Sequence, residues 1–162
     1  MMVSETIAAK PRLDWLAWLA SGVGSGLLSL LITVLLSNAY LGSPWFLVRV
    51  AASLVLGPDV IPTSEAAGAE VIGTGILVHM GLSILYASLI ALVIHRWGLL
   101  VGFFGGGLIG LALYFINLYA LTLAVPWIFS LRSWIIMVGY VAYGALAGTI
   151  YELLDEDDQD VN

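Results

Sequence analysis

Glycine recurs at every fourth residue between positions 98 and 110, and this repeat restricts the fold more than any other feature of the sequence. The four positions are Gly98, Gly102, Gly106 and Gly110. In a helix exposed to water, each glycine would cost up to about 1 kcal/mol relative to alanine. In a lipid bilayer, the same positions let a second helix approach closely, so that close packing replaces the hydrophobic driving force that lipid does not supply. The repeat therefore predicts a membrane helix packed against a neighbour.

Composition places the chain among integral membrane proteins. Hydrophobic residues make up 61% of it and charged residues 10%, with a mean hydropathy of +1.05, whereas charged residues reach about 25% in soluble proteins. Cysteine is absent, which excludes disulfides, Cys-ligated metals and thiol catalysis. Five Lys and Arg are too few for a nucleic-acid interface. The net charge of −6 comes largely from the chain end, because six of the eleven acids lie between Glu152 and Asp160.

Four apolar runs are long enough to span a bilayer, which takes about 20 residues in a helix. They cover residues 15–36, 69–94, 98–123 and 133–154. The first run ends before Ser37-Asn38-Ala39, which resembles a signal-peptide cleavage site, but its length favours a retained anchor. We therefore predict a single all-α membrane domain, residues 1–162, with four transmembrane helices in a glycine-packed bundle. An acidic tail at 155–162 is expected to be solvated.

A fifth, shorter apolar helix is predicted at about 45–56, with Ser43 as its N-cap and Pro44 at its first position. It is too short to span, so we expect it to lie in the interface or to re-enter the membrane. Its one charged residue is Arg49. Either the Arg49 side chain extends to the lipid headgroups, or it pairs with Glu65 or Glu70.

Three of the predicted spanning helices carry pairs or runs of small residues that form packing faces. The predicted helix-packing glycines are Gly22, Gly26, Gly98, Gly102, Gly106, Gly110, Gly144 and Gly148. Only a few residues connect the second and third spans, which therefore predicts a tight antiparallel hairpin. Basic and aromatic residues at the ends of the apolar segments are expected to anchor the chain at the membrane surface. These anchors are Arg49, Arg96, Trp97, Trp127 and Arg132.

The distribution of positive charge predicts the orientation in the membrane. Four spans put both termini on one side, together with Lys10, Arg12 and Arg96, whereas Arg49 and Arg132 fall on the other. The positive-inside rule then favours cytoplasmic termini. We expect a bacterial inner-membrane protein in this orientation.

One polar cluster is predicted within the bundle. His79 is the only ionisable side chain deep inside a span, and Ser83 and Tyr86 share its helix face. Intramembrane ionisable residues are functional candidates by default. Asn117 and Tyr140, on the third and fourth spans, are placed to join them in one interhelical hydrogen-bond network.

Three roles are open for His79. In the first, the neutral imidazole hydrogen-bonds a hydroxyl or carbonyl and holds helices together. In the second it carries protons, although burial disfavours the imidazolium form and no carboxylate is near along the chain. In the third it is an axial haem ligand, although the other histidine, His95, lies sixteen residues away at the membrane edge. Other cofactors and metals are not predicted.

The order of features resembles that of small four-helix bacterial integral membrane proteins of unassigned function. The resemblance rests on RVAASLVLG between the first two spans, HMGLSILYA in the second, a glycine-rich third span and GYVAYGALAGTIYE in the fourth. It implies a four-helix fold and no activity. Proteins of this kind carry a histidine in the fourth helix, where this chain has only Tyr and Gly, so the resemblance does not support a two-histidine site here.

Function is predicted less sharply than fold. The surplus of glycine faces favours a non-catalytic membrane subunit or scaffold that packs with itself or with a larger membrane complex. The alternative is a small transporter or channel that uses His79, Asn117 and Tyr140. A haem-binding membrane protein is the third hypothesis. The expected partners are the lipid bilayer and either a second copy of the chain or another protein, but no nucleic acid.

Overall fold

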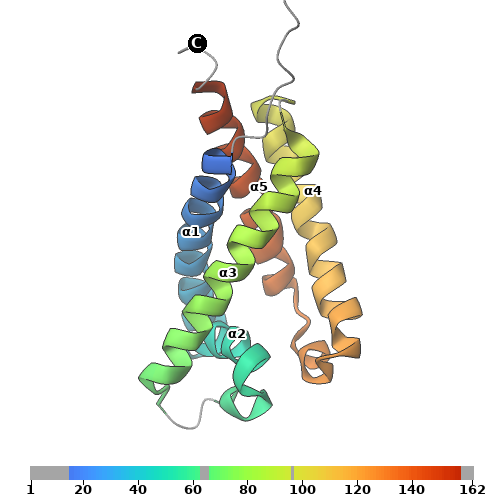
Figure 1. Ribbon diagram of the computed structural model, residues 1–162. Helices are drawn as coiled ribbons and strands as arrows, with labels where there is room; N and C mark the ends of the chain where they lie inside the picture. The colour runs from blue at the N-terminus through green and yellow to red at the C-terminus, as the bar shows by residue number, and fades with distance from the viewer. Residues whose placement is uncertain (1–14, 63–65, 96, 158–162) are drawn as a thin grey trace, which may run out of the picture.

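The chain folds into a helical bundle, and the computed structural model describes its residues 15–62, 66–95 and 97–157 (Figure 1). The α-helices are α1 (Trp15–Leu41), α2 (Phe46–Leu56), α3 (Ala69–Ile94), α4 (Leu99–Phe115) and α5 (Trp134–Asp157). Short 3₁₀ segments are η1 (Pro58–Val60), η3 (Leu121–Leu123) and η4 (Pro126–Leu131), and η2 (Ile116–Ala120) is a π-helical continuation of α4. Within this described part, four helical segments are long and apolar enough to cross a membrane, and α2 is the shorter apolar helix. This confirms the predicted all-α membrane fold.

Helix α5 lies at the centre of the bundle, where it contacts α1, α3 and α4. Its contact with α4 is the most extensive and is made by backbone, because the small residues of the two helices face each other. A Cβ on Gly106 would meet the carbonyl oxygen of Gly144, and a Cβ on Gly102 would lie 2.8 Å from that of Gly148. Such close approach permits Cα–H···O contacts as well as dispersion.

Glycines also set the contact between α1 and α3. A Cβ on Gly22 would lie 2.8 Å from the Ile84 Cα, and one on Gly26 would lie 3.0 Å from the Ser83 Cβ. On the other side of α3, a Cβ on Gly75 would meet the carbonyl of Val48, so α2 packs against the backbone of α3. Glycine faces of this kind thus join α1, α2 and α3 into one layer.

Gly98 does not belong to the packing face that was predicted for it. It precedes α4 with a φ of +85°, and a Cβ added there would meet nothing within 4 Å. A positive φ is one that glycine adopts without steric cost. Gly98 therefore forms the turn into α4, whereas Gly102 and Gly106 lie against α5.

The predicted tight hairpin of α3 and α4 is also wrong. The two helices make few contacts, and Figure 1 shows that they diverge away from their short connection. The physical reason is that their small-residue faces point to different partners. Gly102 and Gly106 hold α4 on α5, whereas Gly75 holds α3 on α2.

Two element ends differ from the prediction. Helix α1 continues to Leu41 through the Ser37-Asn38-Ala39 segment, and the buried Ser37 hydroxyl donates to the Ser43 carbonyl at 2.6 Å. Helix α2 begins at Phe46, and no side chain caps it. The N-cap is Trp45 and not Ser43, whose carbonyl accepts the Phe46 N–H at 3.3 Å.

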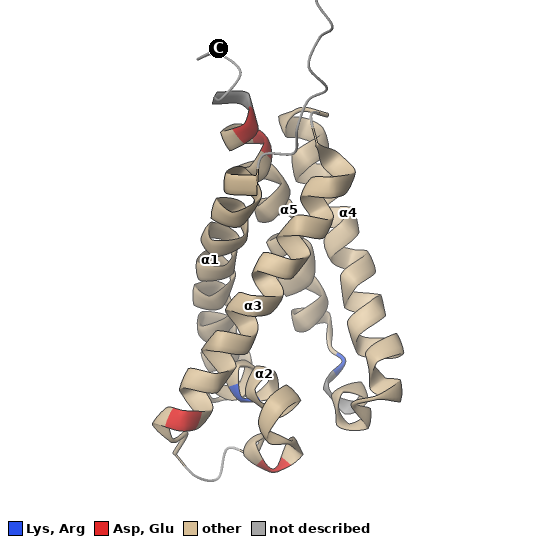
Figure 2. Cartoon of the chain, viewed as in Figure 1, with Lys and Arg blue, Asp and Glu red and all other residues tan. Residues whose placement is uncertain are grey.

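Buried hydrophobic side chains gather at the end of the bundle that contains the start of α1 and the end of α3. There α3, α5 and the start of α1 bury a cluster whose members are Ala17, Ala87, Ile90, Ala91, Ile94, Tyr143, Ala147 and Tyr151. At the opposite end, α2 and η4 cover the bundle. Among the described residues, the charged ones lie toward these two ends of the bundle and none lies in its middle (Figure 2).

Candidate functional site: a polar-lined cavity in the bundle

A cavity of about 220 Å³ lies between α1, α2, α3, α5 and the η2 to η4 segment. Leucine, isoleucine, valine and alanine side chains form most of its wall. The polar residues that line it are Ser29, Thr33, His79, Ser83, Tyr86, Asn117, Tyr140 and Tyr143. All five residues of the predicted polar cluster are among them. Among the described residues, no Lys, Arg, Asp or Glu lines this cavity.

His79 is held against α1 by its Nε2 atom. This nitrogen lies 3.1 Å from the carbonyl oxygen of Gly26 and 3.1 Å from the hydroxyl of Ser29. The Ser29 hydroxyl itself donates to the same carbonyl at 3.1 Å. A carbonyl oxygen only accepts hydrogen bonds, so in the neutral ring the hydrogen belongs on Nε2. His79 therefore holds two helices together, as in the first of the three predicted roles.

A second polar group connects α3, η2 and α5. The Tyr86 hydroxyl donates to Asn117 Oδ1 at 2.9 Å, and Asn117 Nδ2 donates to the Tyr140 hydroxyl at 3.2 Å. Next to it, the Tyr143 hydroxyl donates to the Ser83 carbonyl. The predicted single network is thus divided in the structure. Tyr86, Asn117 and Tyr140 bond to one another, whereas His79 bonds to α1.

Several lining residues were not among the predicted site residues. Ser29 and Thr33 follow Gly22 and Gly26 at spacings of three and four residues, which puts all four on one face of α1. From this spacing, Ser29 and Thr33 could have been predicted to face the same neighbours as the two glycines. Gly139, on α5, also lines the cavity. Nothing in the sequence distinguishes Gly139 from the glycines that make close helix contacts.

Arg49 does not extend to the headgroups. Its side chain is buried at 6% exposure, and Nη1 donates to the carbonyls of Val60 at 3.0 Å and Pro62 at 2.7 Å. Glu65, one of its two predicted partners, lies outside the described residues. Arg49 thus fastens the loop after α2 onto that helix, because a guanidinium can reach two carbonyls at once.

The other predicted anchors divide into two kinds. Trp97 is exposed, and Arg132 is held locally, with Cζ 3.3 Å from the Phe129 ring centroid and Nε donating to the Phe129 carbonyl. Trp127 instead turns inward, where its indole N–H donates to the Ser53 hydroxyl at 3.1 Å. It therefore ties η4 to α2 beside the cavity. Arg96 lies outside the described residues.

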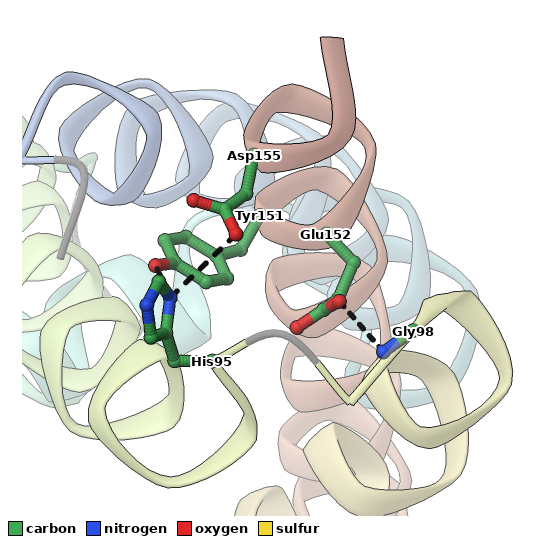
Figure 3. Close-up of polar contacts among 5 residues, drawn as sticks. All are labelled: His95, Gly98, Tyr151, Glu152 and Asp155. Carbon is green, nitrogen blue, oxygen red and sulfur yellow. Dashed lines mark hydrogen bonds and ion pairs between the residues drawn. The ribbon is translucent and has the colours of Figure 1, made fainter. Parts of the chain in front are cut away.

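A separate polar cluster lies at the other end of the bundle, beside the turn from α3 to α4 (Figure 3). His95 Nδ1 is 2.7 Å from the Tyr151 hydroxyl and 3.6 Å from Asp155 Oδ2. The Gly98 N–H donates to Glu152 Oε2 at 2.8 Å. Asp155 is 7% exposed. The predicted solvated tail therefore does not begin at Asp155, because α5 continues and buries that side chain, while residues 158–162 lie outside the described part.

Comparison with known protein families, with curated proteins and with solved structures found no match to this chain.

The wall of the cavity combines apolar side chains, which can enclose a small apolar body, with a few neutral groups that can hydrogen-bond a polar atom on it. Haem ligation by His79 would have to use Nδ1, because Nε2 is engaged by Gly26 and Ser29. His95 lies at the far end of α3, about 24 Å away by helical rise. Among the described residues, no group of three or more metal-ligating side chains is placed to hold a metal ion.

Proposed function

We propose that this chain is a non-catalytic integral membrane protein that binds one small, uncharged, lipid-soluble molecule in its central cavity. The observation that carries the proposal is the wall of that cavity, which combines apolar side chains with neutral hydrogen-bonding groups from α1, α3, α5 and η2. A charged ligand would lose its hydration there without gaining a charged partner among the described lining residues, at a cost of several kcal/mol. A neutral ligand carries no such cost.

The volume of the cavity limits the size of the proposed ligand. An engineered apolar cavity of about 150 Å³ in another protein binds benzene. The cavity of about 220 Å³ in this bundle therefore suits a body of one or two rings, or a branched chain of similar bulk. Naphthalene is a fitting probe, since it has two rings and no polar atom.

Gly139 offers a direct test. It lines the cavity, and a Cβ added there meets nothing within 4 Å, so Gly139→Leu fills the cavity without a clash at the backbone. Gly81→Leu is the matched control, because Gly81 is exposed on the outer face of α3 and its added Cβ also meets nothing. Both variants make the same chemical change in a spanning helix.

The measurement is thermal stabilisation of the detergent-purified protein by naphthalene. A ligand present at about 100 times its Kd stabilises the folded state by about 2.7 kcal/mol. We expect naphthalene to raise the melting temperature of the wild type and of Gly81→Leu, but not of Gly139→Leu. Equal shifts in all three proteins would mean that naphthalene binds elsewhere, and the proposal would then be abandoned.

The scaffold hypothesis is a second proposal with less support. It was based on a surplus of glycine faces, and in this chain Gly22, Gly26, Gly102 and Gly106 already contact neighbouring helices of the same molecule. Association with a second copy or with a larger complex would need another surface. Native mass spectrometry from mild detergent tests it, since dimers or co-purifying subunits would support association and monomers alone would oppose it.

The transporter or channel hypothesis uses the same cavity as a stopping point on a route across the membrane. Tyr86, Asn117 and Tyr140 would then have to separate, because their hydrogen bonds join α3, η2 and α5 around it. Flux of a neutral solute into liposomes, compared between wild type and Gly139→Leu, distinguishes transport from binding. We place the protein in a bacterial inner membrane with cytoplasmic termini, on the charge distribution described above.

A further inference from the structure

The second ring nitrogen of His79, Nδ1, is a hydrogen-bond acceptor. Nε2 carries the ring hydrogen and is used by Gly26 and Ser29, so Nδ1 of the neutral ring keeps a lone pair. No partner of Nδ1 is found among the described residues, and the His79 ring lines the cavity. A ligand that reaches Nδ1 therefore meets an acceptor that is able to receive a hydrogen.

The tyrosine pair leaves one donor unused. Tyr86 gives its hydrogen to Asn117 Oδ1, and Tyr140 receives one from Asn117 Nδ2. The Tyr140 hydroxyl hydrogen is then free. If the Asn117 side-chain amide is rotated by 180°, its nitrogen donates to the Tyr86 hydroxyl and its oxygen accepts from the Tyr140 hydroxyl. The Tyr86 hydroxyl hydrogen is then the free one. In either arrangement, one tyrosine O–H of the cavity wall is available to a ligand.

We infer that the molecule held in the cavity is a neutral apolar alcohol or phenol, recognised through its hydroxyl group by His79 Nδ1 and the unused tyrosine O–H. This rests on the proposed function and names its ligand class. A hydroxyl donates one hydrogen bond and accepts others, so it can satisfy both groups without bringing a charge into the cavity. A ketone or ether would leave Nδ1 without a donor, and a hydrocarbon would leave both groups unpaired.

Two isosteric probes test the inference, 2-naphthol and 2-methylnaphthalene. They share the ring system and differ by a hydroxyl in place of a methyl group. Their affinities are measured for the full-length protein in mild detergent, with Gly139→Leu giving the background of partition into micelles and protein surface. A net hydrogen bond corresponds to about a 3- to 10-fold change in affinity. We expect the wild type to bind 2-naphthol more tightly by that factor after the background is subtracted.

Variants of His79 test whether the preference for 2-naphthol over 2-methylnaphthalene depends on Nδ1 of the His79 ring. His79→Gln keeps an amide hydrogen for the Gly26 carbonyl and an oxygen acceptor for the ligand, so the preference for 2-naphthol should survive. His79→Leu should bind both probes equally. Tyr140→Phe provides a second measure if the leucine variant does not fold, and should reduce the preference about 3-fold. The binding of 2-methylnaphthalene to each variant reports whether its cavity is intact.

The possible results separate the two proposals. Equal binding of the probes by the wild type, with both lost in Gly139→Leu, would overturn the hydroxyl inference and leave the cavity as a site for apolar molecules. A preference for 2-naphthol that persists in His79→Leu and Tyr140→Phe would also overturn it. No cavity-dependent binding of either probe would overturn the proposed function as well.

Discussion

Glu152 shows how a single buried side chain can complete a helix that lies far from it in sequence. It is 1% exposed on α5, and its Oε2 accepts the N–H of Gly98 at 2.8 Å, at the start of α4. The first N–H groups of a helix have no partner within that helix, and negative charge is favourable there. The cap of α4 thus comes from another helix, which a search for local capping residues does not find.

We predict that Glu152→Gln is tolerated better than Glu152→Leu. Glutamine keeps a carbonyl oxygen for the Gly98 N–H and removes a buried charge whose Oε1 has no hydrogen-bond partner among the described residues. Leucine leaves the Gly98 N–H unpaired, which costs about 1–3 kcal/mol. Thermal melts of both variants in one detergent measure the difference. Equal melting temperatures for the two variants would show that this contact does not stabilise α4.

The composition of the candidate site could be predicted from residue types, but the hydrogen-bond partners could not. His79, Asn117 and Tyr140 are polar residues deep in apolar helices, so they had to face protein, and the structure places all three at the cavity. Which groups they bond depends on helix crossing, which periodicity does not specify. For the same reason the burial of Arg49 was missed, because its partners are the carbonyls of Val60 and Pro62 in a loop.

Each helix uses its small residues for a specific neighbour, and this choice determines the architecture. The existence of the four spans follows from the length and apolarity of their segments. Their pairing does not, because a glycine face shows that a helix packs closely and not which helix it meets. A short connection therefore pointed to an α3–α4 hairpin, whereas α4 packs on α5 instead.

Because α4 packs on α5 through glycine, we predict that Gly106→Ala destabilises the protein and that Gly81→Ala does not. A Cβ on Gly106 would meet the Gly144 carbonyl, whereas one on Gly81 would meet nothing within 4 Å. Overpacking a tight contact costs about 1–3 kcal/mol, and alanine is otherwise the better helix former. Unfolding of both variants in detergent with increasing denaturant gives the comparison. A Gly106→Ala protein as stable as Gly81→Ala would mean that the α4–α5 contact can relax.

For the whole molecule, the orientation can be tested because the natural chain contains no cysteine. Asp59 is exposed in η1, between α2 and α3, and Asn162 is the last residue of the sequence. With cytoplasmic termini, a membrane-impermeant maleimide should label Asp59→Cys in intact cells. It should label Asn162→Cys only after permeabilisation. The reverse pattern would invert the proposed topology.

The cavity does not extend along the whole length of the bundle. Ala87, Ile90 and Ala91 are buried in the hydrophobic cluster toward the end of α3, whereas the cavity extends from the level of Tyr86 past His79 toward α2 and η4. The cavity therefore reaches from the middle of α1 and α3 toward one end of the bundle. In a bilayer spanned by these helices, a molecule held in the cavity would lie nearer to the surface at α2 and η4 than to the surface at His95.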